Sequence, residues 1–148
     1  MRGITANLMG LHAEPAVGFY GGFGVRLMSS GGSTAIYSFL VPADYAGGDL
    51  KVREWYREHD SGGVGTAKIF RWLTKLTSTN QTVGLESSVP FPLTNCVGFC
   101  ARTWTLAEAS AAGGDLFWVE LERQGDLGDD TMGRLDLIGV AVEYLAIQ

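Results

Sequence analysis

Acidic residues gather between two apolar runs late in the sequence, and their carboxylates could hold a cation. Asp126, Asp129 and Asp130 lie in the segment QGDLGDD, with Glu122 before it and Asp136 after it. Carboxylate oxygens are ligands that Ca²⁺ prefers, so a calcium-binding corner is one interpretation. The spacing differs from that of an EF-hand loop, which needs acids at alternate positions, then a glycine and a more distant glutamate.

A structural role is the favoured interpretation of this acidic loop. Gly125 and Gly128 permit positive φ angles, and aspartate favours turns because it bonds to its own backbone. The flanking runs DLFWVELER and RLDLIGVAVEY are apolar enough to be buried strands, and acids between them would keep the rim of the fold soluble. We therefore predict a solvent-exposed strand connection, with no metal and no other cofactor.

The remaining ionisable residues do not match a catalytic motif. His59, Asp60 and Ser61 are adjacent in HDSGGVG, whereas a Ser/His/Asp triad converges from separate segments, and no G-x-S-x-G motif occurs. The two histidines, His12 and His59, are far apart, which makes an enzyme on a cupin-like barrel the weakest option. The glycine runs YGGFG and SSGGS lack the G-K-[ST] of a phosphate-binding loop. The sequence therefore predicts a protein that is not an enzyme.

Cys96 and Cys100 are four residues apart. On one continuous strand this separation is roughly 13 Å, beyond the ~7 Å that a disulfide allows between Cα atoms. Pairing would require the strand to break near Gly98, so we predict reduced thiols and assembly in a reducing cytoplasm. The N-terminal stretch MRGITANLMGLHAEP is a poor signal peptide, because polar residues interrupt its apolar run.

Apolar and polar residues alternate in many short segments, which is the signature of half-buried strands. In DLKVREWYRE, Leu50, Val52 and Tyr56 share one face, and in DLFWVELER the inward positions begin with Phe117. The 21 glycines and the 18% share of charged residues also favour short strands joined by tight turns. We predict an all-β fold, an antiparallel, jelly-roll-like β-sandwich with about eight strands.

The chain has 148 residues, which fits a single domain. Residues 34–148 carry the predicted sandwich, and residues 1–33 form a Gly-rich N-terminal segment that includes Phe19, Tyr20 and Phe23. Glycine weakens a strand. This segment is therefore either a bulged first strand or hairpin, or an extended arm whose aromatic residues anchor on a neighbouring subunit.

Several tryptophans are predicted to lie on polar strand faces. Their charged neighbours on the same face are Lys51, Arg53 and Arg57 for Trp55, Glu120 and Glu122 for Trp118, and Arg102 for Trp104. Aromatic residues on polar faces can stack on sugars and are enriched at protein interfaces. Half-buried packing at sheet margins, a subunit interface and a glycan platform all remain open.

The net charge of −5 at pH 7 argues against a chain-wide basic surface for nucleic acid. Two basic clusters alternate with apolar residues and are interpreted as solvated strand faces: Lys51, Arg53 and Arg57, and Lys68, Arg71 and Lys75. No apolar run approaches the ~18 residues of a membrane span. Neither nucleic acid nor a membrane is predicted as a partner.

Two stretches resemble single jelly-roll virion proteins of tailed phages and related viruses. About residues 36–58 include YSFLVPADYAGGDLKVREWYRE, an aromatic–Val–Pro–x–Asp–Tyr start followed by a strand. About residues 112–145 include GGDLFWVELERQGDLGDDTMGRLDLIGVAVEYL, in which an Asp-rich loop joins two apolar strands. The resemblance implies a capsid decoration (cement) or minor capsid protein, and it brings no catalytic residue with it.

We therefore expect a viral structural protein on the capsid surface of a virion, forming a homo-oligomer, a trimer, and contacting other capsid proteins. The expected interface residues are Phe19, Tyr20, Phe23, Trp55 and Trp118. The alternative is a carbohydrate-binding, lectin-like β-sandwich module of a virion fibre or secreted protein, with exposed tryptophan beside aspartate and Ca²⁺ as an optional ligand.

Overall fold

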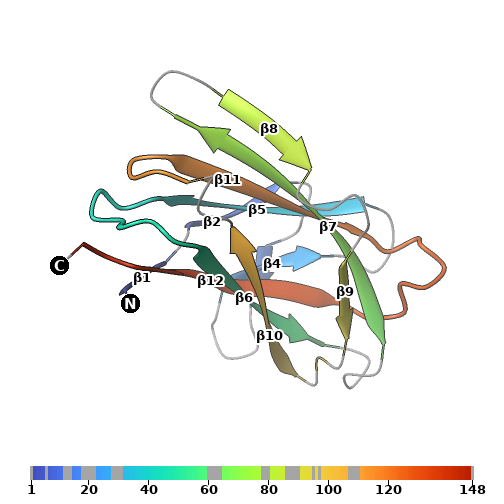
Figure 1. Ribbon diagram of the computed structural model, residues 1–148. Coiled ribbons are helices and arrows are strands. Elements are labelled where there is room, and N and C mark those ends of the chain that lie inside the picture. Colours follow the sequence, from blue (N-terminus) through green and yellow to red (C-terminus); the bar gives the residue numbers. More distant parts are fainter. Residues whose placement is uncertain are drawn as a thin grey trace.

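The computed structural model describes residues 2–5, 7–11, 15–17, 23–27, 32–59, 65–77, 81–85, 91–94, 96, 98–106 and 111–147. These residues form two antiparallel sheets stacked face to face, and the predicted all-β, jelly-roll-like sandwich is confirmed (Figure 1). Sheet A contains β1 (Arg2–Thr5), β3 (Pro15–Val17), β4 (Phe23–Leu27), β6 (Leu50–Glu58), β10 (Phe99–Leu106) and β12 (Leu135–Tyr144). Sheet B contains β2 (Asn7–Leu11), β5 (Gly32–Leu40), β7 (Thr66–Leu76), β8 (Gln81–Leu85), β9 (Phe91–Thr94) and β11 (Leu116–Gln124).

The strand order is β10-β6-β12-β4-β3 in sheet A and β2-β5-β11-β7-β8 in sheet B. β1 and β4 pair with successive parts of β12, and β8 and β9 pair with successive parts of β7. The described residues form twelve strands where the alternation pattern predicted about eight, and this sharing of positions accounts for two of the additional strands. In the described part of the chain, no helix is long and apolar enough to cross a membrane.

The Gly-rich N-terminal segment supplies strands to both layers. β1 pairs with β12, β2 pairs with β5, and β3 and β4 form an antiparallel pair that extends sheet A. The β3–β4 pair lies where a hairpin was one of the two predictions, and the alternative of an arm anchored on a neighbouring subunit stays a prediction. Phe23 is the first residue of β4, whereas Phe19 and Tyr20 lie outside the described residues.

The core lies between the layers and follows the predicted alternation. In β6 the inward residues Leu50, Val52 and Tyr56 are buried, and in β11 so are Phe117 and its neighbours at every second position. Burying one large apolar side chain contributes roughly 1.5–3 kcal/mol. These residues therefore supply the main driving force for stacking the two sheets.

The acidic loop after β11 departs from the prediction at one residue. Asp129 is exposed, as expected, but the side chain of Asp130 is buried against Arg123. The Arg123 Nη2 and Nε atoms donate to the Asp130 carboxylate at 2.6 and 3.1 Å, and Arg123 Nη1 also donates to the Leu27 carbonyl at 3.0 Å. An arginine buried at the end of β11 needs a counter-charge. Asp130 therefore fastens the loop to the core instead of only keeping the rim soluble.

The prediction of reduced cysteines is wrong, because Cys96 and Cys100 form a disulfide with Cα atoms 4.9 Å apart. β10 begins only at Phe99, so the two cysteines do not lie on one continuous strand. Gly98 has a φ of 72°, a left-handed conformation that glycine adopts readily. The chain therefore turns between the cysteines and brings their sulfurs together.

The disulfide gives a first prediction. In the chain-entropy account, closing so short a loop stabilises the fold by about 2 kcal/mol, so the Cys96→Ser/Cys100→Ser variant should unfold at lower urea concentration. Thiol titration of the denatured, unreduced protein should find no free thiol. Two titratable thiols in protein made under oxidising conditions would contradict the assignment.

Candidate functional site

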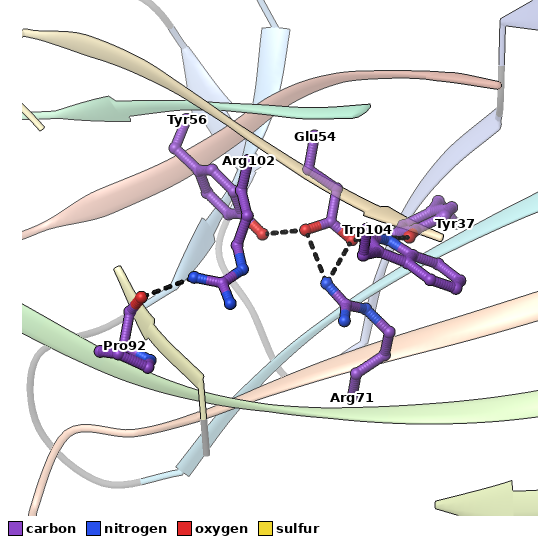
Figure 2. A network of polar contacts seen from close by, with 7 residues as sticks. All are labelled: Tyr37, Glu54, Tyr56, Arg71, Pro92, Arg102 and Trp104. Carbon is purple, nitrogen blue, oxygen red and sulfur yellow. Dashed lines mark hydrogen bonds and ion pairs between the residues drawn. The ribbon is translucent and has the colours of Figure 1, made fainter. Parts of the chain in front are cut away.

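Glu54 is the centre of a polar network between the two sheets (Figure 2). It is 0% exposed, and its carboxylate accepts hydrogen bonds from Tyr37 Oη and Tyr56 Oη, each at 2.7 Å. Arg71 Nη2 reaches both carboxylate oxygens at 3.1 and 3.2 Å, and Trp104 Nε1 donates at 2.9 Å. Glu54 and Tyr56 come from β6, Trp104 from β10, Tyr37 from β5 and Arg71 from β7, so the network joins both layers.

The network around Glu54 is built to hold the fold rather than to react. Four side chains donate to one carboxylate, which fills its capacity to accept hydrogen bonds. The Arg71 guanidinium also lies 4.3 Å from the centre of the Trp104 ring, which adds a cation–π contact. At the margin of the network, Arg102 of β10 donates to the Pro92 carbonyl of β9 at 2.7 Å, tying the edge of one sheet to the edge of the other (Figure 2).

Ionisation of the network residues follows from this environment. Burial raises the pKa of Tyr37 and Tyr56 well above the usual value, and the nearby Glu54 carboxylate adds to the effect. Burial alone would lower the pKa of Arg71, but Glu54, Tyr37 and Tyr56 together outweigh burial, so the pKa of Arg71 is raised. The tyrosines therefore stay neutral and Arg71 stays charged at physiological pH.

Two network residues correct the sequence predictions. Arg71 is 4% exposed, so it does not belong to a solvated face, while its neighbours Lys68 and Lys75 pair with Asp129 and Asp115 at 2.7 and 2.8 Å. Trp104 is likewise buried instead of lying half-buried at a sheet margin. In both cases the inward position is stabilised by Glu54, a partner that the sequence pattern did not reveal.

The inward direction of these polar residues fixes what faces outward. Along a strand, neighbouring side chains point to opposite faces. Because Glu54 points into the core, Arg53 and Trp55 point out from sheet A. Because Arg71 points into the core, Phe70 and Trp72 point out from sheet B.

Sheet B presents an outer surface of aromatic and acidic residues, here called the aromatic–acidic face: Phe70 and Trp72 of β7, and Trp118, Glu120 and Glu122 of β11. Trp72 is 39% exposed and stands directly opposite Glu120 in the strand register. Trp118 stands opposite Thr74, which makes Trp72 its diagonal neighbour. Diagonal neighbours lie about 7–8 Å apart, within reach of aromatic side chains. Two indole rings and a carboxylate therefore share one rigid surface.

Sheet A presents a different surface, here called the Arg–Trp–Arg strip: Arg53, Trp55 and Arg57 of β6, bordered by Phe99 of β10. The Arg53 guanidinium carbon lies 6.0 Å from the Trp55 ring centre, and that of Arg57 lies 5.6 Å from the Phe99 ring centre. Phe99 is 62% exposed. Trp55 and Trp118, both singled out from the sequence, thus lie on opposite outer faces and are not brought together.

Sequence reasoning missed several surface residues. Trp72 and Phe70 are on the aromatic–acidic face, and Phe99 borders the strip, but of the residues on these two surfaces the interface prediction included only Trp55 and Trp118. The strand of Trp72 is apolar on both faces, so its alternation did not reveal which side is inward. Only the buried position of Arg71 shows that its neighbours Phe70 and Trp72 point outward. In the described residues, no group of three or more His, Cys, Asp or Glu side chains is arranged to hold a metal.

Comparisons with known proteins concern the fold. No protein-family profile matches the sequence, and no curated protein is significantly similar to it. The structure is similar to a family 35 carbohydrate-binding module from Clostridium thermocellum, with a TM-score of 0.59 and 8% identity over 98% of this chain and 100% of that one. It also resembles part of the 4-O-methyl-α-glucuronidase BtGH115A, with a TM-score of 0.50 and 10% identity over 92% of this chain and 16% of that one. At these identities the likeness shows a shared sandwich fold.

The Glu54 network predicts a large effect of a small change. Glu54→Gln keeps the side-chain shape but leaves the Arg71 charge buried without its counter-charge, which costs about 3–5 kcal/mol. We expect urea unfolding to show this loss, and Glu120→Gln on the outer face to change stability by less than about 1 kcal/mol. A loss below about 1 kcal/mol in Glu54→Gln would contradict the structural role of the network.

The raised pKa values of Tyr37 and Tyr56 predict an alkaline transition. Neutral phenols contribute stability that is fully present below the unfolded pKa of about 10 and is lost as pH rises toward the higher folded pKa. Ultraviolet titration at about pH 11 should find fewer of the five tyrosines ionised in native protein than in denaturant. Ionisation of all five near pH 10 in the folded protein, as in the unfolded chain, would be the opposite result.

Proposed function

We propose that this β-sandwich is a carbohydrate-binding domain, and that a polysaccharide with uncharged sugars binds to the aromatic–acidic face. The observation that carries the proposal is the pair of tryptophans, Trp72 and Trp118, on adjacent strands beside the Glu120 carboxylate. Indole rings stack on the apolar faces of sugar rings, while carboxylates accept hydrogen bonds from sugar hydroxyls. The face thus offers both kinds of contact that a sugar chain needs.

The geometry of the face also favours binding. Its side chains stand on the paired interior strands β7 and β11 rather than on loops, and the strand register fixes their spacing. A surface that is ordered before the ligand arrives loses little conformational entropy on binding. The outer face of a sheet is suited to an extended chain of sugars, because successive rings can contact successive side chains.

Two further observations support the proposal. The fold is similar to a carbohydrate-binding module over almost the full length of both chains. The ionisable side chains clustered around Glu54 are buried and hydrogen-bonded to one another, so they are not placed to act on a substrate. The Cys96–Cys100 disulfide is typical of proteins that function in oxidising compartments, where secreted polysaccharide-binding proteins meet their ligands. Together these favour a binding role over catalysis.

The virion role expected from the sequence resemblance stays a prediction. The same holds for the trimer, the capsid partners, the location on a virion, and an interface at Phe19, Tyr20, Phe23, Trp55 and Trp118. The structural comparisons give this role no support, and they favour the alternative of a carbohydrate-binding module.

The test is affinity electrophoresis and calorimetry with neutral polysaccharides: xylan, galactan, mannan and mixed-linkage β-glucan. We expect at least one to bind, and Trp72→Ala and Trp118→Ala each to weaken binding tenfold or more. Covering a third of a tryptophan's roughly 200 Å² at about 25 cal/mol per Å² is worth about 1.7 kcal/mol, slightly more than a factor of ten.

Trp55→Ala is the matched control, because it removes the same ring from the opposite face and should leave neutral-polysaccharide affinity unchanged. If none of the four polysaccharides binds, the proposal fails. It also fails if the bound polysaccharide is held equally well by Trp72→Ala and Trp118→Ala.

A further inference from the structure

The Arg–Trp–Arg strip on sheet A has a chemistry that the aromatic–acidic face lacks. Arg53, Trp55 and Arg57 occupy successive outward positions of β6. At about 3.3 Å per residue, the Cα atoms of the two arginines are about 13 Å apart with the indole between them. This spacing is longer than one sugar ring, so a chain lying along β6 would meet a cation, then an aromatic ring, then a second cation.

The residues beside Trp55 on the neighbouring strands have short side chains or none. Its partners across the sheet are Ala101 on β10 and Gly139 on β12, and those of Arg53 are Thr103 and Ala141. A Cβ atom at Gly139 would lie 3.6 Å from Trp55 Cε3, so the indole lies over the glycine backbone. Short neighbours on both sides of Arg53 and Trp55 leave room for an extended ligand to reach these two side chains.

The strip is positively charged, whereas the protein as a whole is negatively charged. The chain carries a net charge of −5, yet the outward residues of β6 include the cations Lys51, Arg53 and Arg57. Two of these cations face an acid on β12: Arg57 stands opposite Asp136, which is buried and contacts His59, and Lys51 stands opposite Glu143. Neutral residues flank Arg53 on both sides, so the positive charge is concentrated beside Trp55.

We propose that the Arg–Trp–Arg strip is a second ligand site, for an acidic polysaccharide whose sugar rings carry carboxylates. The indole of Trp55 stacks on a sugar ring, and the guanidinium groups bind carboxylates, for which their planar fork is well matched. The stacking of Arg57 on Phe99 holds one guanidinium in place. A densely charged polyphosphate such as duplex DNA fits less well, because the remainder of the protein is acidic and repels it.

This site does not depend on the neutral-polysaccharide site, since the two lie on opposite outer faces and use different residues. The test is calorimetry at low ionic strength with polygalacturonate, alginate, glucuronoxylan and hyaluronan. We expect at least one to bind, and its carboxyl-reduced form, which keeps the rings but loses the charge, to bind at least tenfold more weakly. Salt should weaken the interaction because exposed charges are screened.

The variants locate the site. Arg53→Gln/Arg57→Gln and Trp55→Ala should each weaken binding of the acidic polysaccharide at least tenfold, whereas Arg53→Lys/Arg57→Lys, which keeps the charge but loses the planar fork, should weaken it less than the glutamine variant does. Arg2→Gln/Lys68→Gln changes the net charge equally at positions away from the strip and should have no effect, and Trp118→Ala should have none either. Circular dichroism and urea unfolding check that every variant is folded.

Three results would overturn the proposal. One is that no acidic polysaccharide of the four binds. Another is that binding is as strong in the folded Arg53→Gln/Arg57→Gln variant as in the control of equal charge. The third is that duplex DNA binds the strip as tightly as the best polysaccharide, which would make it a general polyanion site.

Discussion

The buried Glu54 carboxylate is the interaction on which the arrangement of the rest of the structure depends. It collects donors from β5, β6, β7 and β10, and therefore sets the register of both layers at once. A carboxylate taken out of water is tolerated only if its charge and its oxygen atoms are satisfied. Shifting β6 by one residue would turn Glu54 to solvent and leave Arg71 in the core without its counter-charge, and shifting β7 would do the reverse. Only one face of each strand can therefore point into the core.

That constraint determines which chemistry each surface carries. With Glu54 inward, β6 shows arginine and tryptophan to solvent; with Arg71 inward, β7 shows Phe70 and Trp72 beside the acids of β11. Under the two proposals made above, one outer face of the sandwich binds uncharged sugars and the other binds carboxylate-bearing ones. A domain with two such faces could hold two polysaccharide strands, or two parts of a mixed one, on a single rigid body.

The sequence predicted the layered fold because alternation is a local property, and it is regular in strands such as β6 and β11. It could not predict Glu54 and Arg71 as core residues, since each is a polar residue at an inward position whose ionic partner lies on another strand. Arg123 was missed although its partner Asp130 is only seven residues away, because alternation alone does not show that the loop folds back onto it. The disulfide was missed for a related reason: whether β10 includes Cys96 depends on a turn at Gly98, not on the spacing of the cysteines. The stretches that resemble phage virion proteins correspond to β5–β6 and β11–β12, where strands and tight turns follow general sandwich chemistry.

The central claim is that the two outer faces, fixed in direction by the core, are separate ligand surfaces. Nuclear magnetic resonance of the four indole N–H groups tests it directly, because Trp55, Trp72, Trp104 and Trp118 report on the strip, the aromatic–acidic face and the core. A neutral oligosaccharide is predicted to shift the signals of Trp72 and Trp118, an acidic one that of Trp55, and neither that of buried Trp104. Shifts of the same indoles by both ligands, or no indole shift while loop amides respond, would contradict the account.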